Sequence, residues 1–271
     1  MSEFIQLSFT DLQPEQKEIL IAQLADAGVE GFEEVENGLE AFVNKSGYNK
    51  ELIEGIILKY QITFKESNVE NINWNKEWES NFQPVQVGNF VAIRADFHLP
   101  IKEAEHEIII TPKMSFGTGH HATTFMMVEQ MKEIDFQGKS IFDFGTGTGI
   151  LAILAEKLGA EKIYAIDNDD CSIENANENI GKNNCQKITI QKASDAISDL
   201  KFDIILANIN KNVILENFNS LKYQLSKEGI LIISGIIEED KEEILIKASE
   251  FHLQLDKELS KNKWICIKFR N

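Results

Sequence analysis

The chain has 271 residues, 43% hydrophobic and 26% charged, which is typical of a soluble globular protein with room for one large and one small domain. Its 44 Asp and Glu outnumber its 27 Lys and Arg, so the formal net charge is −17. Residues 1–70 alone carry −9, which argues against bare nucleic acid as a partner of that region, because phosphate binding needs clustered Lys and Arg. That acidic surface either attracts a basic protein partner or only aids solubility.

The sequence carries no sign of export or of a membrane anchor. Its first residues lack the basic and apolar regions of a signal peptide, and its longest apolar stretch, residues 229–237, is far shorter than the roughly 20 residues of a membrane helix. Cys171, Cys185 and Cys266 are scattered and form no Cys-x-x-Cys pair, which predicts neither a disulfide framework nor a zinc site. We therefore expect a cytoplasmic protein.

Residues 1–68 predict a small domain in which strands and helices follow the order β-α-β-β-α-β. The two middle strands form a hairpin around Asn37-Gly38, a strong signal for a tight turn. This order is that of a ferredoxin-like α+β sandwich. The predicted strands are 4–9, 31–37, 39–45 and 61–67, and the predicted helices are 14–27 and 49–60.

Residues 69–82 predict a linker helix. Trp74, Trp78 and Phe82 are spaced at i, i+4 and i+8, so they lie along one face of that helix. This stripe either packs against the next domain or contacts a partner, and ordinary packing is the more common use of such a stripe.

Residues 83–271 predict a larger α/β domain. After strands at 89–97 and 105–112 and a helix at 123–134, strands and helices alternate from Ser140 onward. Alternation of this kind, with apolar strands such as 202–209, predicts an open, doubly wound parallel sheet covered on both faces. The alternating strands are 140–145, 162–167, 187–192, 202–209, 229–236 and 264–269, and the helices between them are 149–159, 171–183, 212–226 and 238–251.

The letters Phe-Gly-Thr-Gly occur twice, at 116–119 and at 144–147. The first copy precedes a helix outside the alternation, and the second closes its first strand. The two copies therefore do not mark a duplicated domain.

The second copy belongs to a glycine-rich loop between a strand and a helix, where α/β folds bind ligands. Gly145, Gly147 and Gly149 give Gly-x-Gly-x-Gly, whereas the dinucleotide fingerprint is Gly-x-Gly-x-x-Gly. Asp143 at the strand end would repel a pyrophosphate but suits a ligand that carries an ammonium and a sulfonium. Asp167, which ends the next strand, lies where a ribose diol is bound in such folds.

This combination resembles the class I S-adenosylmethionine-dependent methyltransferases, which implies S-adenosylmethionine as the cofactor, with a NAD(P) enzyme as the alternative. The next candidate is Asn208, at the end of the strand 202–209. Its side-chain carbonyl suits the orientation of a neutral amine toward the methyl group. The alternatives for Asn208 are capping of the following helix or contact with the cofactor only.

Five stretches together resemble the PrmA family, bacterial methyltransferases of ribosomal protein L11, over nearly the whole chain. They read WNKEWESNFQPVQVG, MSFGTGHHATT, DFGTGTGILAI, AIDND and LANI. The resemblance implies that the N-terminal domain recognises the ribosomal protein. It also implies methyl transfer to lysine side chains and to the N-terminal amine.

The same resemblance implies that the cofactor contacts Thr124, Gly145, Asp167 and Asn208, and that the loop of Gly117, Thr118 and Gly119 flanks its methionine portion. Gly147 and Asp143 complete the predicted cofactor site, and no metal is expected. The chain departs from the family pattern where His120 replaces Thr, Ala122 replaces Pro and Asn210 replaces Leu. Those changes affect the start of a helix and the polarity of the amine pocket.

We therefore expect a protein methyltransferase that acts on ribosomal protein L11, free or on the large subunit. We expect it to act as a monomer, without a membrane or a nucleic-acid sequence as a partner. The alternatives are a class I methyltransferase for another protein, RNA or small-molecule amine, and a cofactor-binding scaffold without activity.

Overall fold

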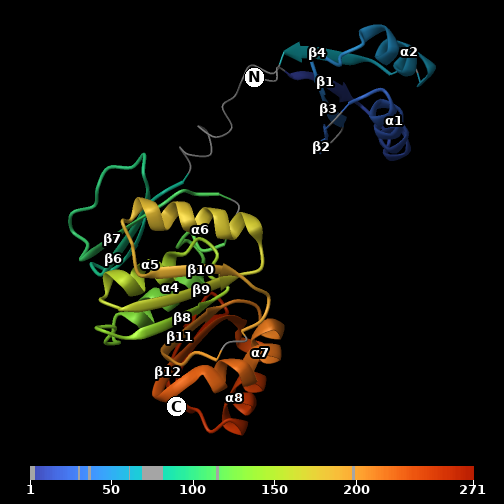
Figure 1. The fold of residues 1–271 in the computed structure, drawn as a ribbon. Helices are drawn as coiled ribbons and strands as arrows, with labels where there is room; N and C mark the ends of the chain where they lie inside the picture. Colours follow the sequence, from blue (N-terminus) through green and yellow to red (C-terminus); the bar gives the residue numbers. More distant parts are fainter. Residues whose placement is uncertain are drawn as a thin grey trace. The chain divides into compact units, whose positions relative to one another are not determined.

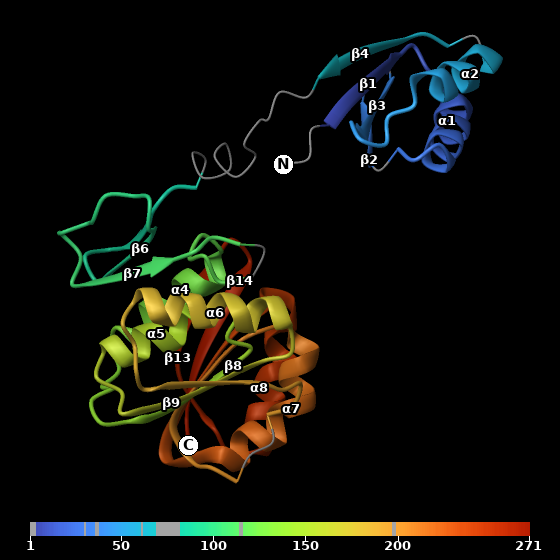
Figure 2. The same ribbon diagram turned by 45° about the horizontal axis from the view of Figure 1, so that its top comes forward.

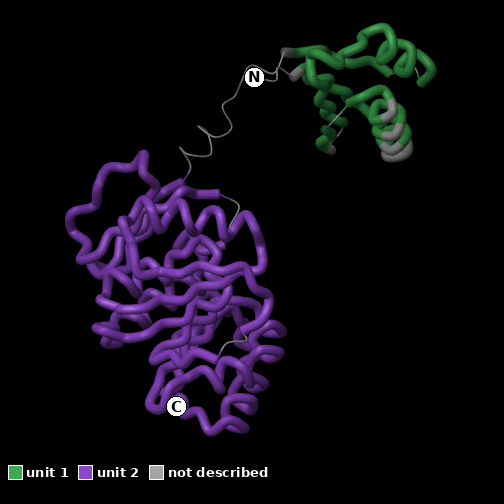
Figure 3. The backbone as a smooth tube through the Cα atoms, viewed as in Figure 1, with its two compact units in different colours: residues 1–81 green, residues 82–271 purple. Residues whose placement is uncertain are grey.

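The computed structural model describes residues 4–29, 31–35, 38–60, 62–68, 82–113, 116–196 and 199–271. The chain divides into two compact units, Met1–Asn81 and Phe82–Asn271 (Figure 3). The predicted linker helix lies outside the described residues except for Phe82. No helix in the described ranges is long and apolar enough to cross a membrane.

The first unit is a four-stranded antiparallel sheet with two helices, and it confirms the ferredoxin-like prediction. Alternate residues of β1, Ile5, Leu7 and Phe9, are buried against Leu20, Leu24 and other apolar side chains of the helices. The strand order is β2-β3-β1-β4. The elements are β1 Phe4–Thr10, α1 Pro14–Asp26, β2 Gly31–Val35, β3 Gly38–Asn44, α2 Lys50–Tyr60 and β4 Phe64–Asn68.

The second unit is built on a seven-stranded sheet of order β10-β9-β8-β11-β12-β14-β13 (Figures 1 and 2). The first five strands are parallel, but β14 is antiparallel to both of its neighbours. The predicted all-parallel sheet is therefore corrected to a mixed one. The strands are β8 Ser140–Phe144, β9 Lys162–Asp167, β10 Ile188–Lys192, β11 Phe202–Asn208, β12 Leu225–Ile237, β13 Gln254–Lys261 and β14 Trp264–Arg270.

Helices cover both faces of this sheet. On one face Ile141 of β8 packs with α4 and α5, and on the other Phe142 and Phe144 pack with α7 and α8. This alternation along one strand follows from the period of two in a β-strand, and it confirms the doubly wound arrangement. The helices are α4 Ala122–Met131, α5 Ile150–Lys157, α6 Asp170–Lys182, α7 Lys211–Gln224 and α8 Lys241–Glu250, with a short 3-10 turn at Glu238–Asp240.

A separate three-stranded sheet precedes α4. It consists of β5 Val85–Val87, β6 Val91–Ala95 and β7 His106–Ile110 in the order β5-β6-β7. β7 pairs in parallel with β6, and the chain then continues toward Phe116 and α4.

Candidate functional site

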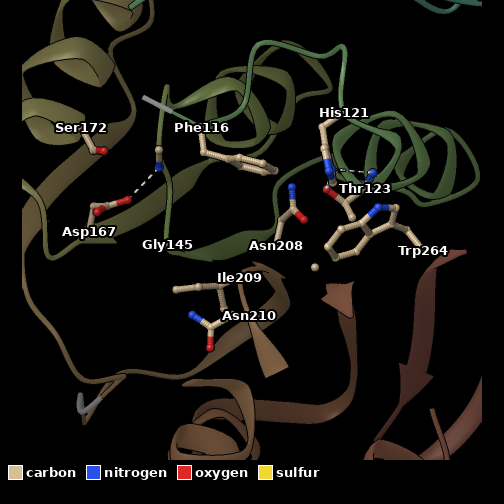
Figure 4. A pocket seen from close by; sticks show the side chains of 12 residues that line it. Phe116, His121, Thr123, Gly145, Asp167, Ser172, Asn208, Ile209, Asn210 and Trp264 are labelled. Carbon is tan, nitrogen blue, oxygen red and sulfur yellow. Dashed lines mark hydrogen bonds between the residues drawn. The ribbon is translucent and has the colours of Figure 1, made fainter. Parts of the chain in front are cut away.

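A cavity of about 350 Å³ lies at the carboxyl ends of β8, β9 and β11 (Figure 4). The strand order reverses between β8 and β11, and open α/β sheets bind ligands at such a switch point. The residues that line the cavity come from several elements: Phe116, His121, Thr123, Gly145, Gly147, Asp167, Ser172, Asn208, Ile209, Asn210, Gly235 and Trp264.

The glycine loop, residues 145–149, forms one wall. Gly147 has a φ of +55°, in the left-handed region that favours glycine. A Cβ atom built on Gly147 would lie 2.3 Å from the carbonyl oxygen of Phe116, so no other residue fits without a shift of the backbone. Gly145 has a φ of +76°, and its Cβ would lie 2.9 Å from the side chain of Ile209. The two glycines thus let the loop approach both Phe116 and Ile209.

The Asp167 carboxylate is held by two backbone N–H groups. Gly147 N donates to Oδ2 at 2.9 Å, and Asp169 N donates to Oδ1 at 3.1 Å. These bonds fix the orientation of the carboxylate at the cavity, where it can accept hydrogen bonds from a diol.

Asn208 lines the cavity, and its side-chain amide oxygen is buried. The residue is only 8% exposed, and its Nδ2 donates to Thr124 Oγ1 at 3.3 Å. Its Oδ1 has no hydrogen-bond partner among the described residues. A buried amide oxygen without a partner costs free energy, so this atom is suited to a donor brought by a ligand.

Three aromatic rings form another wall. His121 lies edge-on to Phe116, with ring centroids 5.1 Å apart, and edge-on to Trp264 at 4.8 Å. His121 also caps α4, because its Nδ1 lies 2.7 Å from Thr123 Oγ1 and 3.4 Å from Thr123 N. Its ring is thereby fixed between the other two, which fits a structural role for His121.

Asp143 lies beneath the glycine loop and is fully buried. The pKa of its carboxyl is raised to about 7, mainly by burial and to a smaller extent by the charge of Asp167, while a 2.6 Å hydrogen bond from Thr146 Oγ1 to Oδ2 opposes the rise. Asp143 Oδ1 has no partner among the described residues. A positive charge bound nearby would therefore stabilise the ionised form of this carboxyl group.

The structure brings together four of the eight residues predicted for cofactor contact. Gly145, Gly147, Asp167 and Asn208 line the cavity. The other four are not among the lining residues: Thr124 bonds to Asn208, Asp143 to Thr146, Gly117 to Thr148 and Thr118 to His120. Direct contact of these four with a cofactor stays a prediction.

Sequence reasoning missed Ser172, Gly235 and Trp264 as lining residues. Gly235 interrupts an apolar strand, which is the signal of a bulge or of a close backbone approach. Its φ is +87°, and a Cβ there would lie 2.3 Å from the carbonyl oxygen of Ile209. Trp264 starts β14, and no local pattern ties that strand to the cavity.

The sheet order, the glycine loop at its switch point and the carboxylate at the end of β9 define the class I S-adenosylmethionine-dependent methyltransferases. A methyltransferase from Pyrococcus furiosus shares the fold, with a TM-score of 0.51 and 16% identity over 60% of this chain and 88% of that one. The family described as Ribosomal protein L11 methyltransferase (PrmA) matches residues 7–271, and this chain belongs to it.

Individual relatives agree with the family. A ribosomal protein L11 methyltransferase of Bacteroides fragilis is 35% identical over 93% of this chain and 93% of its own length. One from Chlorobaculum parvum is 38% identical over 88% of this chain and 86% of its own length. The crystal structure of a ribosomal protein L11 methylase from Lactobacillus delbrueckii subsp. bulgaricus superposes with a TM-score of 0.65 at 31% identity, over 69% of this chain and 98% of that one.

Proposed function

We propose that this protein transfers methyl groups from S-adenosylmethionine to the lysine side chains and the N-terminal amine of ribosomal protein L11. The observation that carries the proposal is the Oδ1 atom of Asn208, a buried acceptor without a partner among the described residues, at the cavity of a chain that matches the family over residues 7–271. Such an acceptor suits an incoming amine donor.

The cavity residues fit S-adenosylmethionine. Gly145 and Gly147 leave the loop wall without side chains, and the oriented Asp167 carboxylate would hold the ribose hydroxyls. Asp143, with no partner for Oδ1, would stabilise the positive charge of the methionine portion. When bound, the cofactor supplies an electrophilic methyl group on a sulfonium.

The residues of this chain then prepare the amine. A lysine ammonium has an ordinary pKa of about 10.4 and must lose a proton before it can attack. The apolar side chains of Ile209 and Trp264 exclude water and favour the neutral amine. Asn208 Oδ1 accepts a hydrogen bond from the amine N–H and so turns the lone pair toward the methyl group. The ammonium proton would pass to solvent before the amine enters the cavity, so this route needs no strong base. The carbon–sulfur bond would break as the carbon–nitrogen bond forms, and the neutral thioether S-adenosylhomocysteine would leave.

The first unit is proposed to recognise the ribosomal protein. Residues 1–70 carry a net charge of −9. Ribosomal proteins that contact RNA phosphates are rich in Lys and Arg, so the acidic unit would attract them. We propose that the protein acts as a monomer in the cytoplasm, on free or ribosome-bound substrate.

Mass spectrometry of purified ribosomal protein L11 after incubation with the protein and S-adenosylmethionine tests the proposal. We expect the mass to rise by one methylene equivalent, a methyl group in place of a hydrogen, for each transfer, on lysine side chains and the N-terminal amine. A parallel incubation with ribosomal RNA is the control. Methylation of the RNA, with none of the protein, would favour an RNA methyltransferase instead.

A further inference from the structure

Three asparagines form a buried row on α6. Asn175 and Asn179 lie within the helix and Asn183 is its C-terminal cap, and at intervals of four residues the three side chains follow one face. Asn175 and Asn179 are 0% exposed and Asn183 is 9% exposed. Buried amides are costly unless they are hydrogen-bonded, so their partners indicate what the row does.

The row bonds to the free edge of β7, which pairs with β6 on its other side. Asn183 Nδ2 donates to Ile109 O at 2.6 Å, and Ile109 N donates to Asn183 Oδ1 at 3.0 Å. Just past β7, Thr111 N donates to Asn179 Oδ1 at 2.7 Å, and Asn175 Nδ2 donates to Thr111 O at 3.0 Å. A side-chain amide has the donor and acceptor of a peptide group, so the row takes the place of a neighbouring strand.

Asn179 also reaches the glycine loop. Its Nδ2 donates to Thr148 O at 2.9 Å and to Asn175 Oδ1 at 3.2 Å. Thr148 in turn donates from Oγ1 to Gly117 O at 2.7 Å and from its backbone N to Phe116 O at 3.0 Å. Asn179 is therefore bonded both to Thr111, which follows β7 on the segment leading toward the loop 116–119, and to the glycine loop on which that loop packs.

We propose that Asn179 is a positioning residue for the cofactor pocket: it sets the glycine loop and the loop 116–119 at the spacing that S-adenosylmethionine requires. This inference rests on one part of the proposed function, the binding of S-adenosylmethionine, and does not depend on which substrate is methylated. Asn179 does not line the cavity, and it acts through Thr148. Preorganised binding loops bind more tightly, because less order is lost when the ligand arrives.

Asn183 offers a matched control. It makes the same pair of bonds to the β7 backbone as its neighbours in the row make to Thr111, but it has no bond to the glycine loop. A purely structural row predicts equal consequences when either residue is replaced. A positioning role predicts that only Asn179 affects the pocket.

The first experiment compares Asn179→Leu with Asn183→Leu by calorimetric titration with S-adenosylmethionine. Leu has the same branched arrangement of heavy atoms as Asn, although it is bulkier, and it removes every hydrogen bond of the side chain. We expect both variants to melt at a lower temperature. We expect the dissociation constant to rise about tenfold in Asn179→Leu and less than about twofold in Asn183→Leu. Equal losses in the two variants, or no loss in Asn179→Leu, would overturn the proposal.

Amide hydrogen exchange without ligand gives a second readout. Because the glycine loop is held by Asn179, peptides that cover residues 145–149 should exchange faster in Asn179→Leu than in Asn183→Leu. Unchanged exchange of these peptides would contradict the positioning role of Asn179, whether or not the protein binds S-adenosylmethionine. Failure of the wild type to bind S-adenosylmethionine would refute only the assigned cofactor.

Should Asn179→Leu not fold, Thr148 variants test the next link of the proposal, from the glycine loop to the loop 116–119. Thr148→Val removes the hydroxyl that bonds to Gly117 O and keeps the shape, whereas Thr148→Ser retains the hydroxyl. We expect weaker binding in Thr148→Val and near-normal binding in Thr148→Ser. If both variants bound S-adenosylmethionine equally well, the hydrogen bond from Thr148 to Gly117 would have no part in positioning the pocket, and the proposal would fail at that step.

Discussion

Thr148, which directly follows the second Phe-Gly-Thr-Gly stretch, donates a 2.7 Å hydrogen bond from its hydroxyl to the carbonyl oxygen of Gly117 in the first, so the two stretches lie against each other. The loops can pack this closely only because Gly117 and Gly147 lack side chains. A Cβ on Gly117 would lie 2.8 Å from Thr148 Oγ1, and a Cβ on Gly147 would lie 2.3 Å from Phe116 O. The shared letters therefore reflect two different loops that pack together, and not a repeated ligand site.

This packing predicts the effect of Gly147→Ala. The new Cβ would displace the loop at Phe116, and alanine is strained at a φ of +55°. We expect the affinity for S-adenosylmethionine to fall at least about tenfold, equivalent to about 1.4 kcal/mol, in a calorimetric titration.

Gly138→Ala is the control for that variant. Gly138 also has a positive φ, +71°, but a Cβ there meets no atom within 4 Å. Its replacement should lower the free energy of unfolding by about 1 kcal/mol without changing the affinity for the cofactor. Equal affinities of the two variants would show that the contact with Phe116 is unimportant.

The orientation of Asp167 predicts its contribution to binding. Asp167→Ala should weaken S-adenosylmethionine binding by about 2–3 kcal/mol, because two charge-assisted hydrogen bonds to the ribose would be lost. Asp170→Ala nearby removes only an ion pair with Lys192 and should leave the dissociation constant unchanged. A normal dissociation constant for Asp167→Ala would exclude the ribose assignment.

Local patterns predicted the elements whose signals are strong. Apolar strands such as β11 and β12 and the glycine loop were located correctly, because burial on both faces and a strand–glycine–helix pattern leave a clear trace. The sequence analysis missed β13. Gln254–Lys261 lies at the edge of the sheet and is mostly exposed, so it is mostly polar and lacks the apolar pattern of a buried strand. Its omission also hid the antiparallel end of the sheet.

The site was predicted in part for a related reason. Asp167 and Asn208 end parallel strands, and such ends meet at one edge of the sheet. Trp264 starts an antiparallel strand, so it reaches the same edge from the opposite direction, which only the strand order reveals. The role of Asn179 was invisible as well, because it depends on which face of α6 meets β7.

The buried carboxyl of Asp143 predicts a pH dependence of stability. Its pKa is raised from 3.8 to about 7 by burial, so the native state binds its proton more tightly than the unfolded state does. Stability from this group is therefore complete below about pH 4 and is lost as the pH rises toward 7, by a few kcal/mol at most. Urea unfolding at pH 5 and pH 8 measures the change.

Asp143→Asn is the comparison for that measurement, because it removes the titration and keeps the shape. The difference in unfolding free energy between pH 5 and pH 8 should then shrink by the contribution of Asp143. Saturating S-adenosylmethionine should shrink it in the wild type too, since a nearby positive charge favours the ionised carboxyl. An equal pH dependence in wild type and variant would mean that Asp143 is ionised throughout.

The free acceptor of Asn208 predicts a loss of turnover that exceeds the loss of binding. Asn208→Ala removes the Oδ1 atom that would orient the amine, and with it the bond to Thr124. We expect kcat for methylation of ribosomal protein L11 to fall about tenfold to a hundredfold. The affinity for S-adenosylmethionine, measured separately by calorimetry, should change less.

Asn217→Ala separates this effect from the cost of losing any buried asparagine. Asn217 is also 8% exposed, but its amide bonds to the backbone of Ala196 and Val213 and it does not line the cavity. Its replacement should lower the melting temperature and leave kcat unchanged. If Asn208→Ala and Asn217→Ala lowered kcat equally, the amine would be oriented by other acceptors, such as backbone carbonyls after β11, and Asn208 would serve the cofactor alone.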